Sequence, residues 1–152
     1  MLNRGLHIRN AEVKDLQAIK EVDQLLFQAD AYPMFVLRQL FDITGELTKV
    51  ALVESKVAGY AIGHYNAENA EAWFLSLGVL PAYRGQRIGE GLMLALIEEV
   101  QARGAAVIQL TVHPANTAAR KLYERLGFKV HKRVEDYYFD AIPRMLMRKE
   151  AG

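Results

Sequence analysis

The sequence contains no cysteine, and that absence removes several kinds of chemistry at once. Disulfide bonds, a thiolate nucleophile and sulfur-ligated metal sites are all excluded. The four histidines fall at no recognisable ligand spacing, so we expect no metal site; they are His7, His64, His113 and His131. Any group transfer by this chain must therefore proceed without a cysteine intermediate.

Long apolar runs and a surplus of one charge are also missing. The longest apolar run, residues 92–97, is far too short to cross a bilayer, and no apolar segment of the kind that directs secretion follows residues 1–5. Lys and Arg total 19 and Asp and Glu total 18, which gives a net charge of +1. Proteins that coat nucleic acid carry a large basic surplus. We therefore expect a cytoplasmic protein that binds neither membranes nor nucleic acid.

The rest of the composition is that of an ordinary globular protein. The chain has 152 residues, of which 51% are hydrophobic and 24% charged. This length suits one domain and is enough to bury a sizeable core. Because no repeat, low-complexity tract or linker interrupts the sequence, we predict a single domain over residues 1–152.

Hydrophobic periodicity predicts a mixed α/β (α+β) fold in the order β-α-α-β-β-β-α-β-α-β-β. The predicted strands are 6–9, 47–53, 57–64, 71–80, 106–112, 128–133 and 137–147, and the predicted helices are 14–28, 35–43, 88–103 and 116–126. Tight turns make most neighbouring strands antiparallel, whereas the crossover from 71–80 through 88–103 to 106–112 makes that pair parallel and right-handed. We expect a sheet of six to seven strands with about four helices covering both faces.

Residues 79–92 lead from a strand through a glycine-containing turn directly into a helix. The first N–H groups of a helix lack internal partners and carry partial positive charge, so such a turn suits a pyrophosphate. Glycines let the backbone approach phosphate oxygens closely. The motifs G-x-x-x-x-G-K-[ST] and G-x-G-x-x-G do not occur. An ordinary strand–turn–helix with helpful glycines is the structural alternative.

The segment Arg84-Gly85-Gln86-Arg87-Ile88-Gly89 resembles the R/Q-x-x-G-x-G/A coenzyme A signature of the GNAT superfamily, preceded by its V-x-P-x-[YF] lead-in. One position departs from the signature, because Arg87 stands where glycine is usual. Residues 86–91 fit the signature's letters fully but lie two residues later than the lead-in predicts. We favour the lead-in, since it places Ile88 and Leu92 where the family's helix buries apolar residues. We interpret Arg87 as a tolerated departure that contacts a phosphate itself.

A second block, residues 116–128, resembles the family's N-x-x-A-x-x-L-Y-x-x-x-G-F block. In that block the Asn helps to hold coenzyme A and the Tyr lies near the thioester sulfur. Each residue also has a structural alternative: Asn116 as a helix N-cap and Tyr123 as a core aromatic. The two blocks stand at the proper separation with a predicted strand between them, which argues against coincidence.

The resemblance implies an acetyl-coenzyme A-dependent N-acetyltransferase with the GNAT fold. In that fold strands 71–80 and 106–112 splay apart, the pantetheine arm pairs with backbone groups near Leu77 and Val79, and freed N–H groups polarise the thioester carbonyl. Because the chain has no cysteine, we expect direct transfer within a ternary complex. We expect Tyr123 to protonate the departing thiolate, as the resemblance also implies. The implied coenzyme-binding residues are Leu77, Gly78, Val79, Arg84, Gly85, Gln86, Arg87, Ile88, Gly89, Glu90, Asn116 and Tyr123.

The general base stays open. Thr111 occupies the position where N-terminal amine acetyltransferases often carry Glu or His, and a threonine cannot serve as a base at neutral pH. His113 lies on the same strand face and titrates in the useful range, and Glu71 begins the neighbouring strand. A loop-entry role for His113, bonded to backbone, is the interpretation that we favour. A water chain that ends on backbone carbonyls is a further alternative.

Within the superfamily, the resemblance is closest to enzymes that acetylate protein N-termini, including the bacterial ribosomal-protein alanine group. Residues 74–79 resemble their substrate-side strand, residues 30–33 occupy their helix 1–helix 2 loop, and residues 136–141 resemble their Y-Y…D-A hairpin in a shorter form. The implied substrate-binding residues are Tyr32, Ser76, Thr111, Tyr137 and Tyr138. Aromatic packing of a terminal strand is the structural alternative for the hairpin. Lysine side chains and small-molecule amines stay open as acceptors.

Two other functions compete with this interpretation. A catalytically silent coenzyme A-binding module is favoured by Thr111 and opposed by Tyr123. A nucleic-acid-associated protein is suggested by a local basic cluster, which more simply forms a solvated helix face or a counter-charge for the coenzyme's phosphates or for an acidic substrate. The cluster comprises Arg120, Lys121, Arg125, Lys129, Lys132 and Arg133. Both a monomer and a homodimer are compatible with the sequence.

Overall fold

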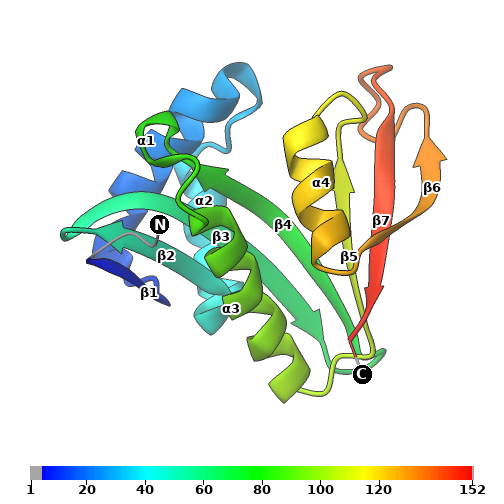
Figure 1. Ribbon diagram of the computed structural model, residues 1–152, viewed down its shortest axis with the longest axis horizontal. Helices are drawn as coiled ribbons and strands as arrows, with labels where there is room; N and C mark the ends of the chain where they lie inside the picture. The colour runs from blue at the N-terminus through cyan, green and yellow to red at the C-terminus, as the bar shows by residue number, and fades with distance from the viewer. Residues whose placement is uncertain (1–4, 152) are drawn as a thin grey trace. The chain divides into compact units, whose positions relative to one another are not determined.

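The computed structural model describes residues 5–151, and their secondary structure follows the predicted order (Figure 1). The strands are β1 (Leu6–Asn10), β2 (Thr48–Val53), β3 (Lys56–Asn66), β4 (Glu71–Val79), β5 (Val107–Val112), β6 (Lys129–Val134) and β7 (Arg144–Glu150). The helices are α1 (Leu16–Phe27), α2 (Met34–Thr44), α3 (Ile88–Ala102) and α4 (Thr117–Arg125). The strands form one mixed sheet in the order β1-β2-β3-β4-β5-β7-β6, which confirms the predicted α+β class.

The pairing of β4 with β5 is short. These strands are parallel, as the crossover predicts, and they pair from Glu71–Trp73 to Val107–Gln109. β4 continues to Val79 and β5 to Val112, beyond the paired residues. On its other side β5 pairs with β7 in antiparallel fashion over its whole length, from Val107 to Val112. The segment of β4 that pairs with β5 is therefore confined to the beginning of the strand.

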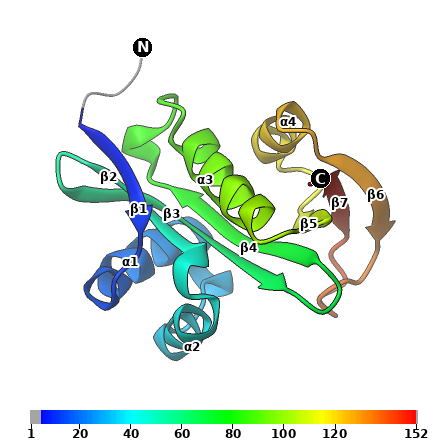
Figure 2. The same cartoon turned by 90° about the horizontal axis from the view of Figure 1, so that it is seen from below.

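The described chain divides into two compact units. The first contains the residues up to His64 together with Ser76–Glu99, and the second contains Tyr65–Leu75 together with the residues from Val100 onward. In the first unit, α1 and α2 cover one face of β1, β2 and β3, and α3 covers the opposite face (Figure 2). This arrangement confirms that helices lie on both faces of the sheet. Its core includes Ile19, Val22, Leu37, Val50, Tyr60 and Ile62.

In the second unit, α4 lies along β5 and β7 (Figure 1). An aromatic cluster forms the centre of its core, with the Phe128 ring centroid 6.0 Å from that of Tyr123 and 6.3 Å from that of Phe74. Leu110 of β5 and Met147 of β7 are also buried. Apolar burial of this kind is the main force that holds the helix on the strands.

The last predicted strand, 137–147, is wrong in its first half. Residues 137–143 form a loop, and β7 begins only at Arg144. Pro143 cannot donate a backbone hydrogen bond to a ladder. Phe139 and Ala141 adopt left-handed backbone conformations, with φ of +60° and +61°, which no β-strand accommodates. The other predicted elements agree with the observed ones to within two residues at each end.

Candidate functional site

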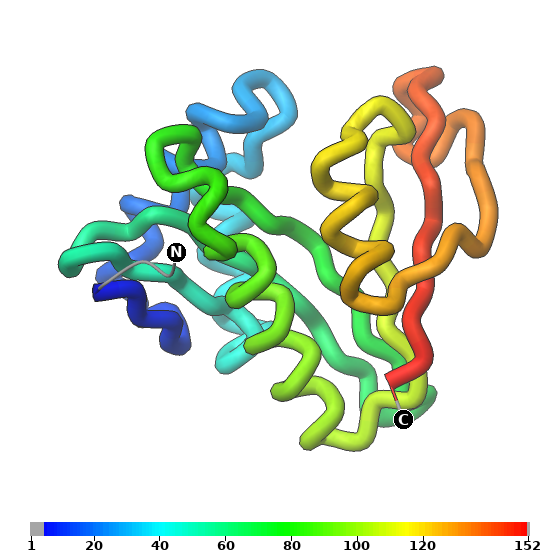
Figure 3. Tube along the Cα trace, viewed as in Figure 1, coloured from blue at the N-terminus to red at the C-terminus, as the bar shows by residue number. Residues whose placement is uncertain are grey.

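The turn between β4 and α3 has the backbone that a phosphate-binding turn requires. A short 3₁₀ turn, Pro81–Tyr83, follows β4 and leads through residues 84–87 into α3 (Figure 3). Gly85 has φ of +82° and Arg87 has φ of +61°. The Gly91 N–H donates to the Arg87 carbonyl at 3.0 Å, which is the first hydrogen bond of the helix. The N–H groups of residues 88–90 come before it, in the first turn, where N–H groups have no acceptor within the helix.

The same geometry decides between the two alignments of the coenzyme A signature. Gly91 lies inside α3, where a Cβ would stand 2.7 Å from Ile8 Cδ1, so its lack of a side chain serves packing against β1. Position 87 instead has the positive φ that glycine ordinarily supplies. The backbone therefore favours the alignment that the lead-in predicts, with Arg87 at the position of the signature's glycine, and the binding roles of these residues stay predictions.

The side chains around this turn fit a phosphorylated ligand. Arg84 and Arg87 are both exposed, and nothing lies within 4 Å of a Cβ built on Gly85. Two guanidinium groups, a helix N-terminus and an open glycine together present positive charge and hydrogen-bond donors without steric obstruction. Gln86, Gly89 and Glu90 of the same segment are half-buried, and Ile88 is buried in the core.

The end of β4 is packed closely onto β3. A Cβ on Gly78 would lie 2.8 Å from both Tyr60 Cε1 and Leu26 Cδ1, and a Cβ on Gly59 would lie 2.7 Å from the Gly78 carbonyl oxygen. Gly78 is thus required by packing, whether or not it contacts coenzyme A. The neighbouring Leu77 and Val79 are half-buried, and their backbone pairing with pantetheine stays a prediction.

A buried hydrogen-bonded network joins α1, β3 and β4. The Tyr60 hydroxyl donates to Asp23 Oδ1 at 2.5 Å and lies 2.8 Å from Ser76 Oγ. Asp23 Oδ2 accepts the backbone N–H of Tyr32 at 2.7 Å. Tyr60 and Asp23 are 0% and 1% exposed. Burial raises the pKa of the Tyr60 phenol well above its usual range, so this hydroxyl stays a hydrogen-bond donor.

This network connects two of the predicted substrate-binding residues, Tyr32 and Ser76, through two residues that the sequence analysis missed. Asp23 stands four residues after Ile19 on the apolar stripe of α1. An acidic residue on a buried helix face needs a partner, and that was the available signal. Tyr60 gave no comparable signal, since a tyrosine in a strand is common.

In the second unit, Tyr123 has the contacts of a core aromatic residue and Asn116 those of a helix N-cap, which are the structural roles given above as alternatives to coenzyme binding. The Tyr123 ring packs on Phe128, and burial raises its pKa to about 12. Asn116 Oδ1 accepts the Ala119 N–H at 3.2 Å as the N-cap of α4. These contacts use the tyrosine ring and one amide oxygen. They do not involve the Tyr123 hydroxyl, which the resemblance places near the thioester sulfur, or the Asn116 amide nitrogen.

The candidate bases have different surroundings. His113 Nδ1 accepts the Ala115 N–H at 3.0 Å, as the loop-entry interpretation predicts. A neutral His113 in this arrangement carries its proton on Nε2, so neither ring nitrogen offers a free lone pair. Glu71 lies at the paired start of β4, and its Oε2 accepts from Gln109 Nε2 at 3.5 Å. The catalytic roles of both residues stay predictions.

Thr111 has a partner in the loop that precedes β7. Its Oγ1 lies 3.0 Å from the Tyr138 hydroxyl. The Tyr137 ring stands edge-on to the Tyr138 ring with centroids 4.8 Å apart, and the Arg144 guanidinium lies 5.1 Å from the Tyr138 ring centroid. Burial raises the pKa of the half-buried Tyr137. The structure therefore brings together three of the predicted substrate-binding residues, namely Thr111, Tyr137 and Tyr138.

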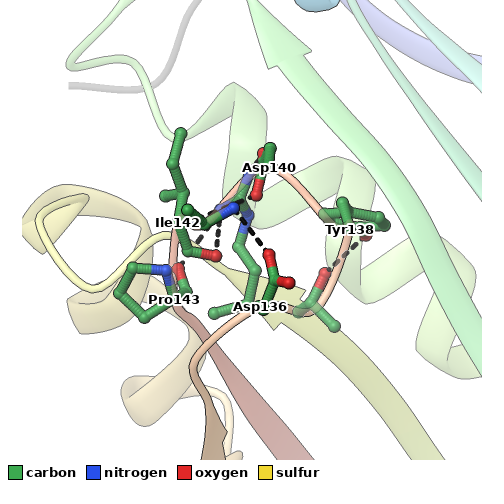
Figure 4. Close-up of polar contacts among 8 residues, drawn as sticks. Asp136, Tyr138, Asp140, Ile142 and Pro143 are labelled. Atoms are coloured by element: carbon green, nitrogen blue, oxygen red, sulfur yellow. Dashed lines mark hydrogen bonds and ion pairs between the residues drawn. The ribbon is translucent and has the colours of Figure 1, made fainter.

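The loop is held in place by its own polar groups (Figure 4). Asp136 Oδ1 accepts the Ala141 N–H at 2.6 Å, and Asp140 Oδ1 accepts the Ile142 N–H at 3.0 Å. Arg144 Nη2 lies 3.4 Å from Asp140 Oδ2, and Nη1 donates to the carbonyls of Ile142 and Pro143. Sequence reasoning assigned no role to Arg144, because a cation at the start of a strand carries no signal of its own.

Within residues 5–151, no helix is long and apolar enough to cross a membrane. The same residues contain no group of three or more His, Asp or Glu side chains that could hold a metal ion.

Comparison with known proteins gives consistent matches. A model of the Acetyltransferase (GNAT) family matches residues 14–128. The ribosomal protein bS18-alanine N-acetyltransferase of Escherichia coli strain K12 is 32% identical over 133 residues, which cover 86% of each protein. N-alpha-acetyltransferase 30 of Schizosaccharomyces pombe is 30% identical over 129 residues, covering 82% of this chain and 86% of the relative. The crystal structure of Ard1 from Thermoplasma volcanium has the same fold, with a TM-score of 0.88 at 22% identity over 96% of this chain and 97% of that one.

Proposed function

The chain belongs to the GNAT family of acetyltransferases, and we propose that it acetylates the α-amine at the N-terminus of a protein or peptide. It is an acetyl-coenzyme A-dependent N-acetyltransferase. Two relatives that span most of its length are named for transfer to a ribosomal protein alanine and to an N-terminal α-amine. These names support the proposal for the acceptor.

The observation that carries the proposal is the pair of tyrosines before β7. Tyr138 is 55% exposed, and its hydroxyl lies on Thr111 of β5 while its ring lies against Arg144. A phenol hydroxyl can both donate and accept, so it can bind the N–H and C=O groups of a peptide backbone. A small amine offers no such repeating pattern. A loop that fixes two adjacent tyrosines therefore favours a peptide acceptor.

The role of each residue in the reaction follows from its chemistry. Acetyl-coenzyme A, as substrate, supplies the thioester whose acetyl group moves to the amine. Arg84, Arg87 and the first N–H groups of α3 bind its pyrophosphate. Tyr123 holds a proton on its hydroxyl at neutral pH, since burial raises its pKa to about 12, and it donates that proton to the departing sulfur. With no cysteine in the chain, transfer is direct within a ternary complex.

The experiment that tests the acceptor is a turnover measurement with the purified chain, acetyl-coenzyme A and detection of released thiol. Peptides with free Ala, Ser or Met N-termini are compared with N-terminally blocked copies, a polyamine and an amino sugar. We expect turnover on the free peptides and none on the blocked copies. Turnover restricted to the small amines would overturn the proposal.

A matched variant tests the tyrosine loop. Tyr138→Phe removes one hydroxyl and keeps the ring, so we expect the KM for the peptide to rise about fivefold to tenfold, as loss of one hydrogen bond predicts. The KM for acetyl-coenzyme A should stay unchanged. An unchanged peptide KM would show that the Tyr138 hydroxyl does not contact the acceptor.

A further inference from the structure

We propose that Asp23 and Tyr60 are positioning residues that orient the Ser76 hydroxyl as a hydrogen-bond acceptor for the incoming amine. The inference rests on the proposed function as an acetyltransferase and on the prediction that Ser76 contacts the acceptor. Asp23 and Tyr60 themselves lie in the core and do not touch the substrate.

The direction of each hydrogen bond follows from the groups involved. Both oxygens of the Asp23 carboxylate accept, Oδ1 from the Tyr60 hydroxyl at 2.5 Å and Oδ2 from the Tyr32 N–H at 2.7 Å. Tyr60 has one proton, and it is committed to Asp23. In the contact of 2.8 Å with Ser76, the Tyr60 oxygen must therefore accept and the Ser76 hydroxyl must donate.

This order decides what Ser76 can offer to a ligand. Its only proton points toward Tyr60, so its remaining capacity is that of an acceptor. An amine or ammonium group presents N–H donors, which this lone pair complements. Ser76 is half-buried, whereas Asp23 and Tyr60 are almost completely buried, so the chain of bonds runs from the core to a less buried position on β4.

The packing around Tyr60 keeps the chain of bonds in place. Gly78 has no Cβ, and one would stand 2.8 Å from Tyr60 Cε1, so the tyrosine ring lies directly on the β4 backbone two residues beyond Ser76. Residues two apart on a strand share one face, which places Ser76 and the bare Gly78 backbone on the side that faces Tyr60. The same carboxylate, through Tyr32, fixes the segment between α1 and α2.

A double-mutant cycle tests whether Tyr60 acts through Ser76. The variants are Tyr60→Phe, Ser76→Ala and the double variant, and the readout is kcat/KM for the acceptor that the wild-type chain acetylates. We expect each single variant to lose roughly tenfold and the double variant to lose no more than either single one. The KM for acetyl-coenzyme A should change less than about twofold, since a positioning role on the acceptor leaves that site intact. Losses that multiply in the double variant would overturn the proposal.

Two controls and one substitute variant separate positioning from folding. Ser76→Thr keeps a hydroxyl and should retain most of the activity. Tyr65→Phe changes another tyrosine of β3 and should leave kcat/KM unchanged. Should Tyr60→Phe fail to fold, Asp23→Asn takes its place in the cycle, and we expect it to lower kcat/KM in the Ser76 background but not in the Ser76→Ala background.

The outcome is distinguishable from failure of the proposed function. If the wild-type chain acetylates a small amine and no peptide, the peptide proposal fails, and the cycle is measured with that amine. Calorimetric affinity for the acceptor gives a second readout that does not depend on turnover. Non-additive effects of the substitutions at positions 60 and 76 support the positioning role of Tyr60 with any acceptor, and additive effects refute it.

Discussion

Replacing Arg87 by glycine should make the protein more stable and its binding of acetyl-coenzyme A weaker. Arg87 has φ of +61° at the first residue before α3, in a region that a side chain disfavours by about 1–2 kcal/mol. Glycine removes that strain but loses about 0.5–1 kcal/mol through its greater freedom in the unfolded chain. At the middle of these ranges the net gain in the free energy of unfolding is about 0.7 kcal/mol, or roughly 1–3 °C in Tm for a chain of this size.

The effect on binding has the opposite sign. A charge-assisted hydrogen bond to phosphate contributes about 1.5–3 kcal/mol, and exposure to solvent reduces this to about 1 kcal/mol. The KM for acetyl-coenzyme A should then rise about fivefold to tenfold, less at high salt because ions screen an exposed charge. Thermal unfolding and thiol-release kinetics at two salt concentrations measure both effects on the same preparations.

Two companion variants separate backbone strain from charge. Arg87→Asn tolerates the left-handed conformation without a charge, so it should lose affinity like the glycine variant. Arg87→Lys keeps a charge and the strain, so it should retain most of the affinity and gain no stability. An unchanged KM in the Gly and Asn variants would refute the phosphate contact, and a lower Tm in the Gly variant would refute the strain argument.

Three further predictions concern other parts of the chain. Tyr123→Phe should lower kcat by about a hundredfold or more, as loss of an acid predicts, with little change in either KM, and an unaltered kcat would exclude it as the acid. Arg144→Gln should release Tyr138 and raise the acceptor KM a few-fold, while the exposed Arg133→Gln serves as a silent control in the same kinetic assay. The hydrogen bond from Arg9 lowers the pKa of Asp15 in the folded protein. The ionised Asp15 therefore stabilises the fold fully at pH values above the pKa of Asp in the unfolded chain, about 3.9. This stability is lost as the pH falls through the lower pKa of the folded state. Urea unfolding from pH 3 to 7 should therefore show a weaker acid dependence in Asp15→Asn than in the wild type.

The fold was predictable because local signals agreed along almost the whole chain. Residues 88–102 show a helical stripe that ends at a glycine, and residues 107–112 are a β-branched run, so both elements were predicted within one residue at each end. The one large error is the strand predicted over residues 137–143, where aromatic residues, which are common in strands, occur in a loop. Asp136 and Asp140 instead close the loop by accepting backbone N–H groups, and alternation of residue types does not reveal such contacts.

The candidate site was predictable where a residue's role follows from a local motif. The backbone of the turn at 84–87 is such a case, since the positive φ at Arg87 explains why the signature has a glycine at that position. The binding role of the turn stays a prediction. The hydrogen bond between Asp23 and Tyr60 was not predictable, because it joins residues 37 positions apart in the sequence. Sequence shows that Asp23 lies on an apolar helix face, but only the packing of α1 on β3 shows which group satisfies it.

The measurement that tests the central claim most directly locates the acetyl group on a product. A peptide with a free N-terminal alanine and one internal lysine is incubated with the chain and acetyl-coenzyme A, and fragment masses assign the modified nitrogen. An acetyl group on the α-amine, and not on the lysine, is the predicted result. Acetylation of the lysine side chain, or an unmodified peptide under conditions in which a small amine is acetylated, would contradict the account.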